Sequence, residues 1–377
     1  MTTLFAAAFI SLSLVAFIWI AYPIAIWFLS RAIARPHQLS RVRGIDQQVS
    51  VVLATRERAE LIERRVQNLL ETDFPATNLD VVVALDAGGA NATVAELSHL
   101  DPRVRVVLGD QPGGKASTLN AGVRAATGDV IVFADSAQIF DRRTIPELVN
   151  YLDDERFGAV SGALTLGGAE QGASPVHKYW KLEKWLRHNE SILHSSIGVT
   201  GAVYAVRRKL WPALPVGTLL DDVYVPMSVI LAGHRVGFTY AARATDVRAF
   251  GSDAEAVRKT RTLTGVLQLL HLLPDLISAK NPVRAQFIMH KLARLATPFL
   301  LAVCATASVS MLLLLVIRYP RQTLPLLIVF AMLVGIIPPL RRACVGGIRW
   351  LYVLQLATVR ALNNGLRARW SVWQDPK

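Results

Sequence analysis

Hydrophobic positions divide the chain into three parts. The run from Leu4 to Leu29 contains no charged residue and is long enough to cross a bilayer as a helix. Between Gln48 and Asp246 the apolar residues come in short runs separated by polar segments, and after Asp246 long apolar runs return. The pattern predicts a folded domain between N-terminal and C-terminal membrane helices.

The central part alternates between strand-like and helix-like patterns. The expected strands cover residues 49–54, 79–85, 104–108 and 130–133, and the expected helices cover 57–70 and 115–126. This alternation predicts an α/β domain whose mostly parallel, Rossmann-like sheet has helices on both faces. Ligands would bind at the carboxyl ends of its strands.

Basic residues follow the first apolar run and do not precede it. Arg31, Arg35, Arg41 and Arg43 come after the run, whereas Met-Thr-Thr before it carries no basic side chain. The positive-inside rule then places the following chain in the cytoplasm. A cleaved signal peptide is less favoured, because it would begin with positive charge. We predict a retained anchor over residues 1–31.

Two further membrane crossings are expected, at residues 296–317 and 323–340. Residues 263–295, which precede them, suit amphipathic helices that lie in the interface, because polar residues and Pro274 interrupt their apolar pattern.

The last segment, residues 343–377, is expected to form an interfacial helix and a basic cytoplasmic tail. A further crossing by Ile348–Leu366 is the alternative, but Arg349 and Arg360 would be costly in lipid. The whole pattern predicts a multi-pass protein of the plasma (inner) membrane, with the folded domain, residues 45–262, in the cytoplasm.

Composition supports the membrane interpretation. The 377 residues are 52% hydrophobic, and the mean hydropathy is +0.36. A net charge of +13 could indicate nucleic-acid binding, but the basic residues cluster beside the apolar runs. We therefore expect membrane lipids and no nucleic acid as partners. Cys304 and Cys344 lie in or near apolar stretches and indicate neither a metal site nor a disulfide.

Three polar residues of the central part suggest phosphate chemistry. Lys115 follows a Gly-Gly turn and opens a predicted helix, an arrangement that can hold an anion. Asp86 and Asp135 each follow a predicted strand, where a helix cap is the simplest role for either one. Two carboxylates at one sheet edge beside a lysine favour a nucleotide and metal site instead.

Two further pairs are candidates for chemistry. Asp221 and Asp222 are adjacent carboxylates in an apolar context, which suits a general base, although one of them could cap the following helix. Arg258 and Arg261 stand one helical turn apart and could bind one anion. Contact with lipid headgroups is an equally weighted alternative for the arginines.

Five segments of the chain form an ordered series. They are VVLATRERAELIERRVQNLL, GGKASTLNAG, VFADSAQIF, GVTGAVYAVRRKLW and LLDDVYVPMSVILAGHRVGF. The series resembles the membrane-bound family 2 glycosyltransferases, which include hyaluronan, chitin and cellulose synthases and many exopolysaccharide transferases. The resemblance covers nearly the whole chain. It implies a GT-A fold and an inverting transfer from a nucleotide sugar, usually a UDP-sugar.

The resemblance also implies roles for the residues that bind the donor. Thr55 and Glu57 would line the nucleoside pocket, and Asp86 would contact the uracil. Lys115 would lie near the nucleoside or the diphosphate. Asp135 would hold the diphosphate through a cofactor ion, Mg²⁺ or Mn²⁺.

The remaining implied roles concern the reaction itself. Asp222 would be the general base that deprotonates the acceptor hydroxyl, and Asp221 would support it. Arg258 and Arg261 would help neutralise the leaving UDP.

Two departures from the family pattern affect the expected activity. Ala137 stands where the DxD motif has its second ligand, so weak metal binding is expected. Thr262 stands where the QxxRW motif of processive synthases has tryptophan. With only two C-terminal crossings expected as well, addition of one sugar is favoured over processive synthesis.

The sequence therefore predicts a transferase that acts on a lipid-linked or membrane-proximal glycan acceptor, in polysaccharide or glycolipid biosynthesis. Other polysaccharide-assembly proteins are possible partners. The alternatives are a processive polysaccharide synthase and an inactive nucleotide-binding subunit of a polysaccharide complex.

Overall fold

The structure is a computed structural model of the chain that describes residues 1–38, 47–97, 99–167, 175–246 and 252–370. It divides into two compact units. The terminal unit comprises Met1–Ile24, Gly251–Leu267 and Ile288–Lys377, and the central unit comprises Ala25–Phe250 and Gln268–Phe287. Each unit is described by itself.

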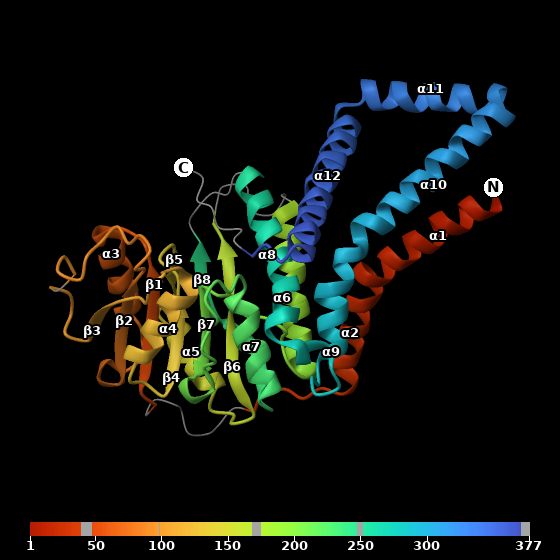
Figure 1. Cartoon of the computed structure of the whole chain (residues 1–377). Coiled ribbons are helices and arrows are strands. Elements are labelled where there is room, and N and C mark those ends of the chain that lie inside the picture. The colour runs from red at the N-terminus through yellow and green to blue at the C-terminus, as the bar shows by residue number, and fades with distance from the viewer. Residues whose placement is uncertain (39–46, 98, 168–174, 247–251, 371–377) are drawn as a thin grey trace. The chain divides into compact units, whose positions relative to one another are not determined.

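An eight-stranded sheet forms the central unit, in the order β3-β2-β1-β4-β7-β6-β8-β5 (Figure 1). The strands are β1 (Val49–Thr55), β2 (Leu79–Leu85), β3 (Val104–Leu108), β4 (Val130–Ala134), β5 (Gln138–Phe140), β6 (Phe157–Leu166), β7 (Val203–Arg207) and β8 (Arg235–Asp246). The four strands expected from the sequence are confirmed, with β1 and β4 each one residue longer than expected.

The sheet is mixed, so the expectation of a mostly parallel sheet holds for only one half of it. β3, β2, β1 and β4 are mutually parallel. Beyond β4 the pairs β4–β7, β7–β6 and β8–β5 are antiparallel, and only β6–β8 is parallel. The alternation of strands and helices indicates that strands follow one another, but it does not determine the direction in which a later strand enters the sheet.

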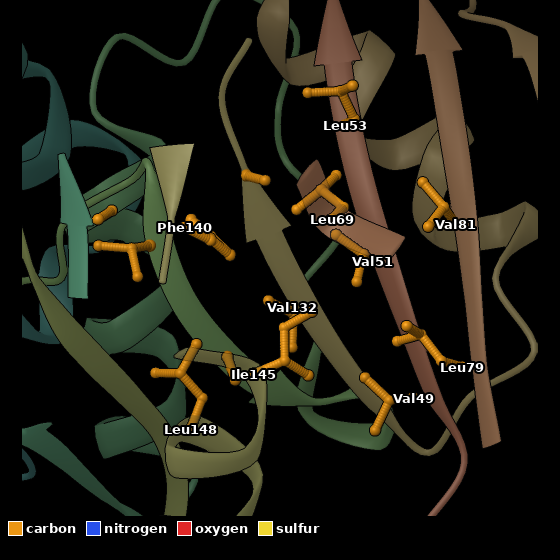
Figure 2. Packing of buried hydrophobic residues seen from close by; sticks show 14 of the residues in the cluster. Val49, Val51, Leu53, Leu69, Leu79, Val81, Val132, Phe140, Ile145 and Leu148 are labelled. Atoms are coloured by element: carbon orange, nitrogen blue, oxygen red, sulfur yellow. The ribbon is translucent and has the colours of Figure 1, made fainter. Parts of the chain in front are cut away.

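Helices cover both faces of the sheet. Those of the central unit include α3 (Ala59–Leu70), α4 (Lys115–Ala125), α5 (Thr144–Tyr151), α6 (Pro175–Leu193), α7 (Asp221–Leu231) and α9 (Arg284–Phe287). Because side chains alternate along a strand, β1 sends Val49, Val51 and Leu53 to one face. There they pack with apolar residues of α3 and α5, such as Leu69 and Leu148 (Figure 2).

The opposite face carries α4. Gly122 of α4 lies against Val52 of β1 and Ala84 of β2, two residues that alternate with those of the core cluster. The close approach that glycine allows therefore sets the distance of α4 from the sheet, and α4 begins with Lys115.

The terminal unit is helical. Its helices are α1 (Thr2–Ala16), the first residues of α2 (Tyr22–Ala32), most of α8 (Ser252–Leu272), α10 (Thr297–Arg318), α11 (Pro320–Ile336) and α12 (Pro338–Leu366). The indole of Trp19 donates a hydrogen bond to Thr297 Oγ1 over 3.0 Å. The guanidinium of Arg294 lies 4.4 Å from the ring of the same tryptophan. These contacts fix the first apolar helix against the start of α10.

Two continuous helical stretches of the described residues, Thr2–Ala32 and Arg284–Arg318, are long and apolar enough to cross a membrane by length and composition. Pro320–Ile336 is apolar but shorter. Membrane crossing itself, like the domain boundaries drawn from the sequence, stays a prediction.

The helix ends in this region differ from those expected. α11 covers 320–336 rather than 323–340, and the expected interfacial segment Ile348–Leu366 is the later part of one long helix, α12. The break falls at Ile337 because two prolines follow it, and proline disfavours helical geometry at the residue before it. Pro338 then starts the next helix, a position at which its missing N–H is not needed.

A Gly122→Ala substitution should destabilise the protein. A Cβ at Gly122 would lie 2.6 Å from Val52 Cγ1, and such overpacking typically costs about 1–3 kcal/mol. Gly335 of α11 is the matched control, because a Cβ there meets nothing within 4 Å. Denaturant unfolding of the purified variants should show a loss for Gly122→Ala and none for Gly335→Ala. Equal midpoints would contradict the packing of α4.

Candidate functional site

The carboxyl ends of β1, β2 and β4 meet at one edge of the sheet. The three strands are parallel and in register, with Thr55 opposite Leu85 and Leu53 opposite Ala134. Asp86 and Asp135 follow directly on β2 and β4. The structure therefore brings both carboxylates to the edge at which the sequence predicted them.

Asp86 holds the glycine turn that precedes α4. Its Oδ1 accepts hydrogen bonds from the backbone N–H groups of Gly88 and Gly114, each over 2.8 Å, and its Oδ2 accepts one from Arg56 Nε over 2.6 Å. Gly113 has a φ of +88°, and a Cβ there would lie 2.6 Å from Asp86 Oδ1. The turn thus requires glycine, and Asp86 fixes a loop from another strand instead of capping a helix of its own.

The environment of Asp86 keeps it ionised. Burial by itself would raise the pKa of its carboxyl, but the amide donors of Gly114 and Gly88 and the Arg56 guanidinium together hold that pKa below its ordinary value. At neutral pH the charged acceptor binds the turn more strongly than a neutral one would.

Lys115 brings two other carboxylates together. Its Nζ lies 3.4 Å from Asp135 Oδ1 and 3.4 Å from Asp221 Oδ2. A Cβ built at Gly201, in the loop before β7, would lie 3.5 Å from Asp222 Cβ and 3.6 Å from Lys115 Nζ. We call Lys115, Asp135, Asp221 and Asp222 the Lys115 cluster. Its members come from three separate segments of the sequence and meet in one site.

The start of α7 presents the acidic pair. Asp221 and Asp222 are its first two residues, and the preceding N-cap residue, Leu220, makes no side-chain cap. The expected alternative, in which one aspartate is the N-cap, is therefore wrong. Negative charge in the first turn is favoured by the helix dipole. The backbone N–H of Val199 donates to the carbonyl of Asp222 over 2.8 Å, which ties α7 to the loop before β7.

Thr55 and Glu57 lie at the end of β1. Thr55 Oγ1 shares a 2.8 Å hydrogen bond with Ser136 Oγ and accepts another from the backbone N–H of Glu57. These contacts join the end of β1 to the residue that follows Asp135. The nucleoside-binding roles of Thr55 and Glu57 stay predictions.

Arg258 and Arg261 lie three residues apart on α8, and both are half-buried. They belong to the terminal unit, whereas the Lys115 cluster belongs to the central unit. Their expected contact with a leaving diphosphate therefore stays a prediction.

The chain's own groups offer a divalent cation an incomplete set of ligands. No group of three or more His, Cys, Asp or Glu side chains that could hold a metal occurs in the described residues. Asp135 offers one carboxylate, 37% exposed, while the Ser136 hydroxyl already bonds Thr55. Mg²⁺ commonly uses one or two carboxylates together with substrate phosphates. The site therefore fits a cation that is shared with a diphosphate.

Arg65 of α3 is a contributor that the sequence did not reveal. Its guanidinium is buried, lies 4.4 Å from the ring of Phe140 and donates from Nε to the carbonyl of Asp135 over 3.0 Å. Burial lowers its pKa to about 9. It shares the buried stripe of α3 with Ile62, Val66 and Leu69. A charged residue on that stripe is the signal that could have identified it.

Comparison with known proteins assigns the domain. Residues 50–211 match the profile of the family Glycosyl transferase family 2. They form a glycosyltransferase family 2 domain. The matched part includes Thr55, Asp86, Lys115 and Asp135 and ends before the acidic pair of α7.

Two curated relatives have glycosyltransferase names. Glycosyltransferase AglD of Haloferax volcanii is 31% identical over 142 residues, which are 36% of this chain and 22% of that protein. The probable glycosyltransferase YdaM of Bacillus subtilis is 24% identical over 208 residues, 52% of this chain and 49% of that protein. The chain thus spans no more than about half the length of these relatives.

A solved structure extends the likeness of fold. The mannosyltransferase PcManGT from Pyrobaculum calidifontis, in complex with GDP-Man and Mn²⁺, superposes with a TM-score of 0.68 at 22% identity. The match covers 96% of this chain and 99% of that one. It confirms an α/β, GT-A-like fold with a mixed sheet.

The stability supplied by Asp86 should depend on pH. Because its folded-state pKa lies below the ordinary value of 3.8, its contribution is complete above about pH 4 and is lost as the pH falls through the folded-state value. Asp86→Asn should therefore lower the unfolding midpoint at pH 7 relative to wild type, and the difference should shrink towards pH 3. Exposed Asp110→Asn is the control. A difference that does not change with pH would contradict the role of the charge.

Proposed function

We propose that the protein is an inverting glycosyltransferase that moves a sugar from a nucleotide sugar, expected to be a UDP-sugar, to a lipid-linked or membrane-proximal glycan acceptor. The observation that carries the proposal is the Lys115 ammonium, which lies 3.4 Å from both Asp135, the proposed metal and diphosphate ligand, and Asp221, the neighbour of the proposed base. Sugar transfer needs the diphosphate-binding group and the base to lie close together, because the bond to the leaving diphosphate breaks at the same carbon that the acceptor attacks.

The sheet edge would bind the donor. Thr55, Glu57 and Asp86 would surround the nucleoside, and Lys115 would pair with the diphosphate. Asp135 would hold Mg²⁺ or Mn²⁺ jointly with the diphosphate oxygens. When bound, the cation would neutralise negative charge on the leaving group.

Asp222 would be the general base. Its carboxylate would take the proton of the acceptor hydroxyl while that oxygen bonds to the anomeric carbon. The bond from the anomeric carbon to the diphosphate oxygen breaks on the opposite side, its electron pair leaves with the nucleoside diphosphate, and the configuration inverts. Asp221 would keep the base in place, and Arg258 and Arg261 would add positive charge near the departing diphosphate.

The apolar helices favour an acceptor at a membrane. Thr2–Ala32 and Arg284–Arg318 have the length and composition of membrane spans, and such an anchor would hold the domain near lipid-linked glycans. A processive synthase and an inactive nucleotide-binding subunit are the competing functions. A product that is longer by a single sugar would exclude a processive synthase. Turnover of a nucleotide sugar by the purified protein would exclude an inactive subunit.

Asp222→Asn should abolish sugar transfer without loss of donor binding, because the amide cannot accept the proton. The assay is release of nucleoside diphosphate from a panel of UDP-sugars together with GDP-mannose, since the superposed mannosyltransferase binds GDP-Man. Binding of the nucleoside diphosphate is measured by calorimetry. Asp110→Asn, an exposed aspartate that pairs with Arg124, is the control. Full turnover by Asp222→Asn would contradict the assignment of the base.

Metal binding should depend on the nucleotide. Asp135 alone offers a single carboxylate, so Mn²⁺ should bind weakly to the free protein and much more tightly with UDP or GDP present, and EDTA should abolish turnover. The paramagnetic signal of free Mn²⁺ measures binding directly. Asp135→Asn should remove the gain that the nucleotide gives, while Asp110→Asn should keep it. Equally tight binding with and without nucleotide would refute the shared site.

A further inference from the structure

Tyr204 carries a buried polar group that neither the proposed mechanism nor the fold uses. The residue lies on β7 and is 1% exposed. Its hydroxyl has no hydrogen-bond partner in the described part of the chain. Buried hydroxyl groups are nearly always paired, so an unpaired one needs a physical explanation.

The ring of Tyr204 is fixed firmly. It stacks on the ring of Phe133 with centroids 4.6 Å apart, and Phe133 stacks on Trp211 at 4.9 Å. Tyr204 and Phe133 are also opposite each other in the β4–β7 pair. Because the ring is buried and stacked on its cross-strand neighbour, the hydroxyl has a set position, and a partner has to come to it.

The hydroxyl lies on the site side of the sheet. Val203 and Ala205, its neighbours on β7, belong to the core cluster on the other face. Phe133, its partner across the strands, precedes Asp135 by two residues. The loop that leads into β7 contains Gly201, which lies beside Asp222 and Lys115. These three observations place Tyr204 next to the Lys115 cluster.

The charges around the hydroxyl are those of the same cluster. Burial raises the pKa of Tyr204 well above its ordinary value, and the carboxylates of Asp221, Asp222 and Asp135 raise it further. The phenol therefore stays protonated and remains a hydrogen-bond donor.

An acceptor in the cluster is also unsatisfied. Asp221 Oδ2 is buried and makes no hydrogen bond among the described residues. It forms an ion pair with Lys115 Nζ at 3.4 Å, a distance longer than that of a strong hydrogen bond. A buried donor and a buried acceptor thus lie in one site, and neither is fully satisfied.

We propose that Tyr204 is a positioning residue whose hydroxyl donates a hydrogen bond to Asp221 when Lys115 turns to the diphosphate of the bound donor. This inference rests on the proposed function. Once Lys115 leaves, Asp221 loses its cation and lies next to a like charge on Asp222. A neutral donor on a fixed ring then holds Asp221 in place, and through it Asp222, without adding a charge that would compete for the diphosphate.

Tyr204→Phe tests the proposal with an isosteric change. We expect kcat to fall by roughly 10- to 100-fold, the range for loss of a hydrogen bond to a charged group. The KM for the nucleotide sugar should stay within about twofold, because Tyr204 acts on the base and not on donor binding. The unfolding midpoint should not fall, because the substitution removes a hydroxyl that is unpaired in the free protein.

Tyr151→Phe is the matched control. The Tyr151 hydroxyl hydrogen-bonds Ser191 and the backbone of Phe238, and its ring stacks on His37. This variant should lose stability and keep its kcat.

A double-mutant cycle with Asp221→Asn tests the route of action. If Tyr204 acts through Asp221, adding Tyr204→Phe to Asp221→Asn should change kcat by less than about twofold. Additive losses would refute the inference. So would an unchanged kcat in Tyr204→Phe, or a loss of stability as large as that of Tyr151→Phe.

The two proposals fail separately. If Asp222→Asn is inactive and Tyr204→Phe matches wild type, the transferase assignment stands and only the role of Tyr204 is refuted. If Asp222→Asn keeps full turnover, the proposed base is wrong whatever Tyr204→Phe does.

Discussion

The candidate site depends on one buried carboxylate, that of Asp86. It lies at the end of β2, and it accepts a hydrogen bond from the backbone N–H of Gly114, the N-cap residue of α4. Lys115 follows Gly114 directly. The position of its ammonium therefore depends on the hydrogen bond between Gly114 and Asp86, which lies at the end of β2. Both glycines of the turn have positive φ, a conformation that only glycine adopts readily, and the hydrogen bond to Asp86 helps to hold the turn in it.

Some charged groups of the site are partly exposed, such as Lys115 and Asp135, and others are buried, such as Arg65. The Lys115 cluster holds three carboxylates and one ammonium, an excess of negative charge that must be stabilised before any cation or donor arrives. The first turn of α7 contributes its dipole to Asp221 and Asp222. Arg65 contributes from behind Asp135, where its buried guanidinium bonds the backbone. Part of the negative charge of the cluster is therefore balanced by the protein itself.

Much of the parallel half of the fold could be predicted from sequence, because β1, β2 and β4 are buried, mostly apolar runs and the edge strand β3 is apolar except for Arg105. The runs at 79–85 and 104–108 match β2 and β3 without change. The order and direction of β6, β7 and β8 could not be predicted, since they depend on tertiary pairing that no local pattern encodes. For the site, the motifs identified Asp86, Lys115, Asp135 and the acidic pair. They did not identify Arg65, whose charge is masked by other charged residues along α3.

Tyr204 shows why the rest of the site could not be predicted from the sequence. In the sequence it stands within an apolar run and is no different from a core aromatic, and its ring is indeed packed as one. Only the antiparallel pairing of β7 with β4 places it opposite Phe133, two residues before Asp135, and its hydroxyl lies within electrostatic range of Asp221, Asp222 and Asp135. The loop before α7 is also held by Gln268, a residue that the sequence did not single out. Gln268 accepts a hydrogen bond from the N–H of Leu219 and donates one to the carbonyl of Gly217. Gln268 lies near the end of α8, the helix that carries Arg258 and Arg261. The loop that leads into the acidic pair is therefore positioned by a side chain that lies outside the five motif segments.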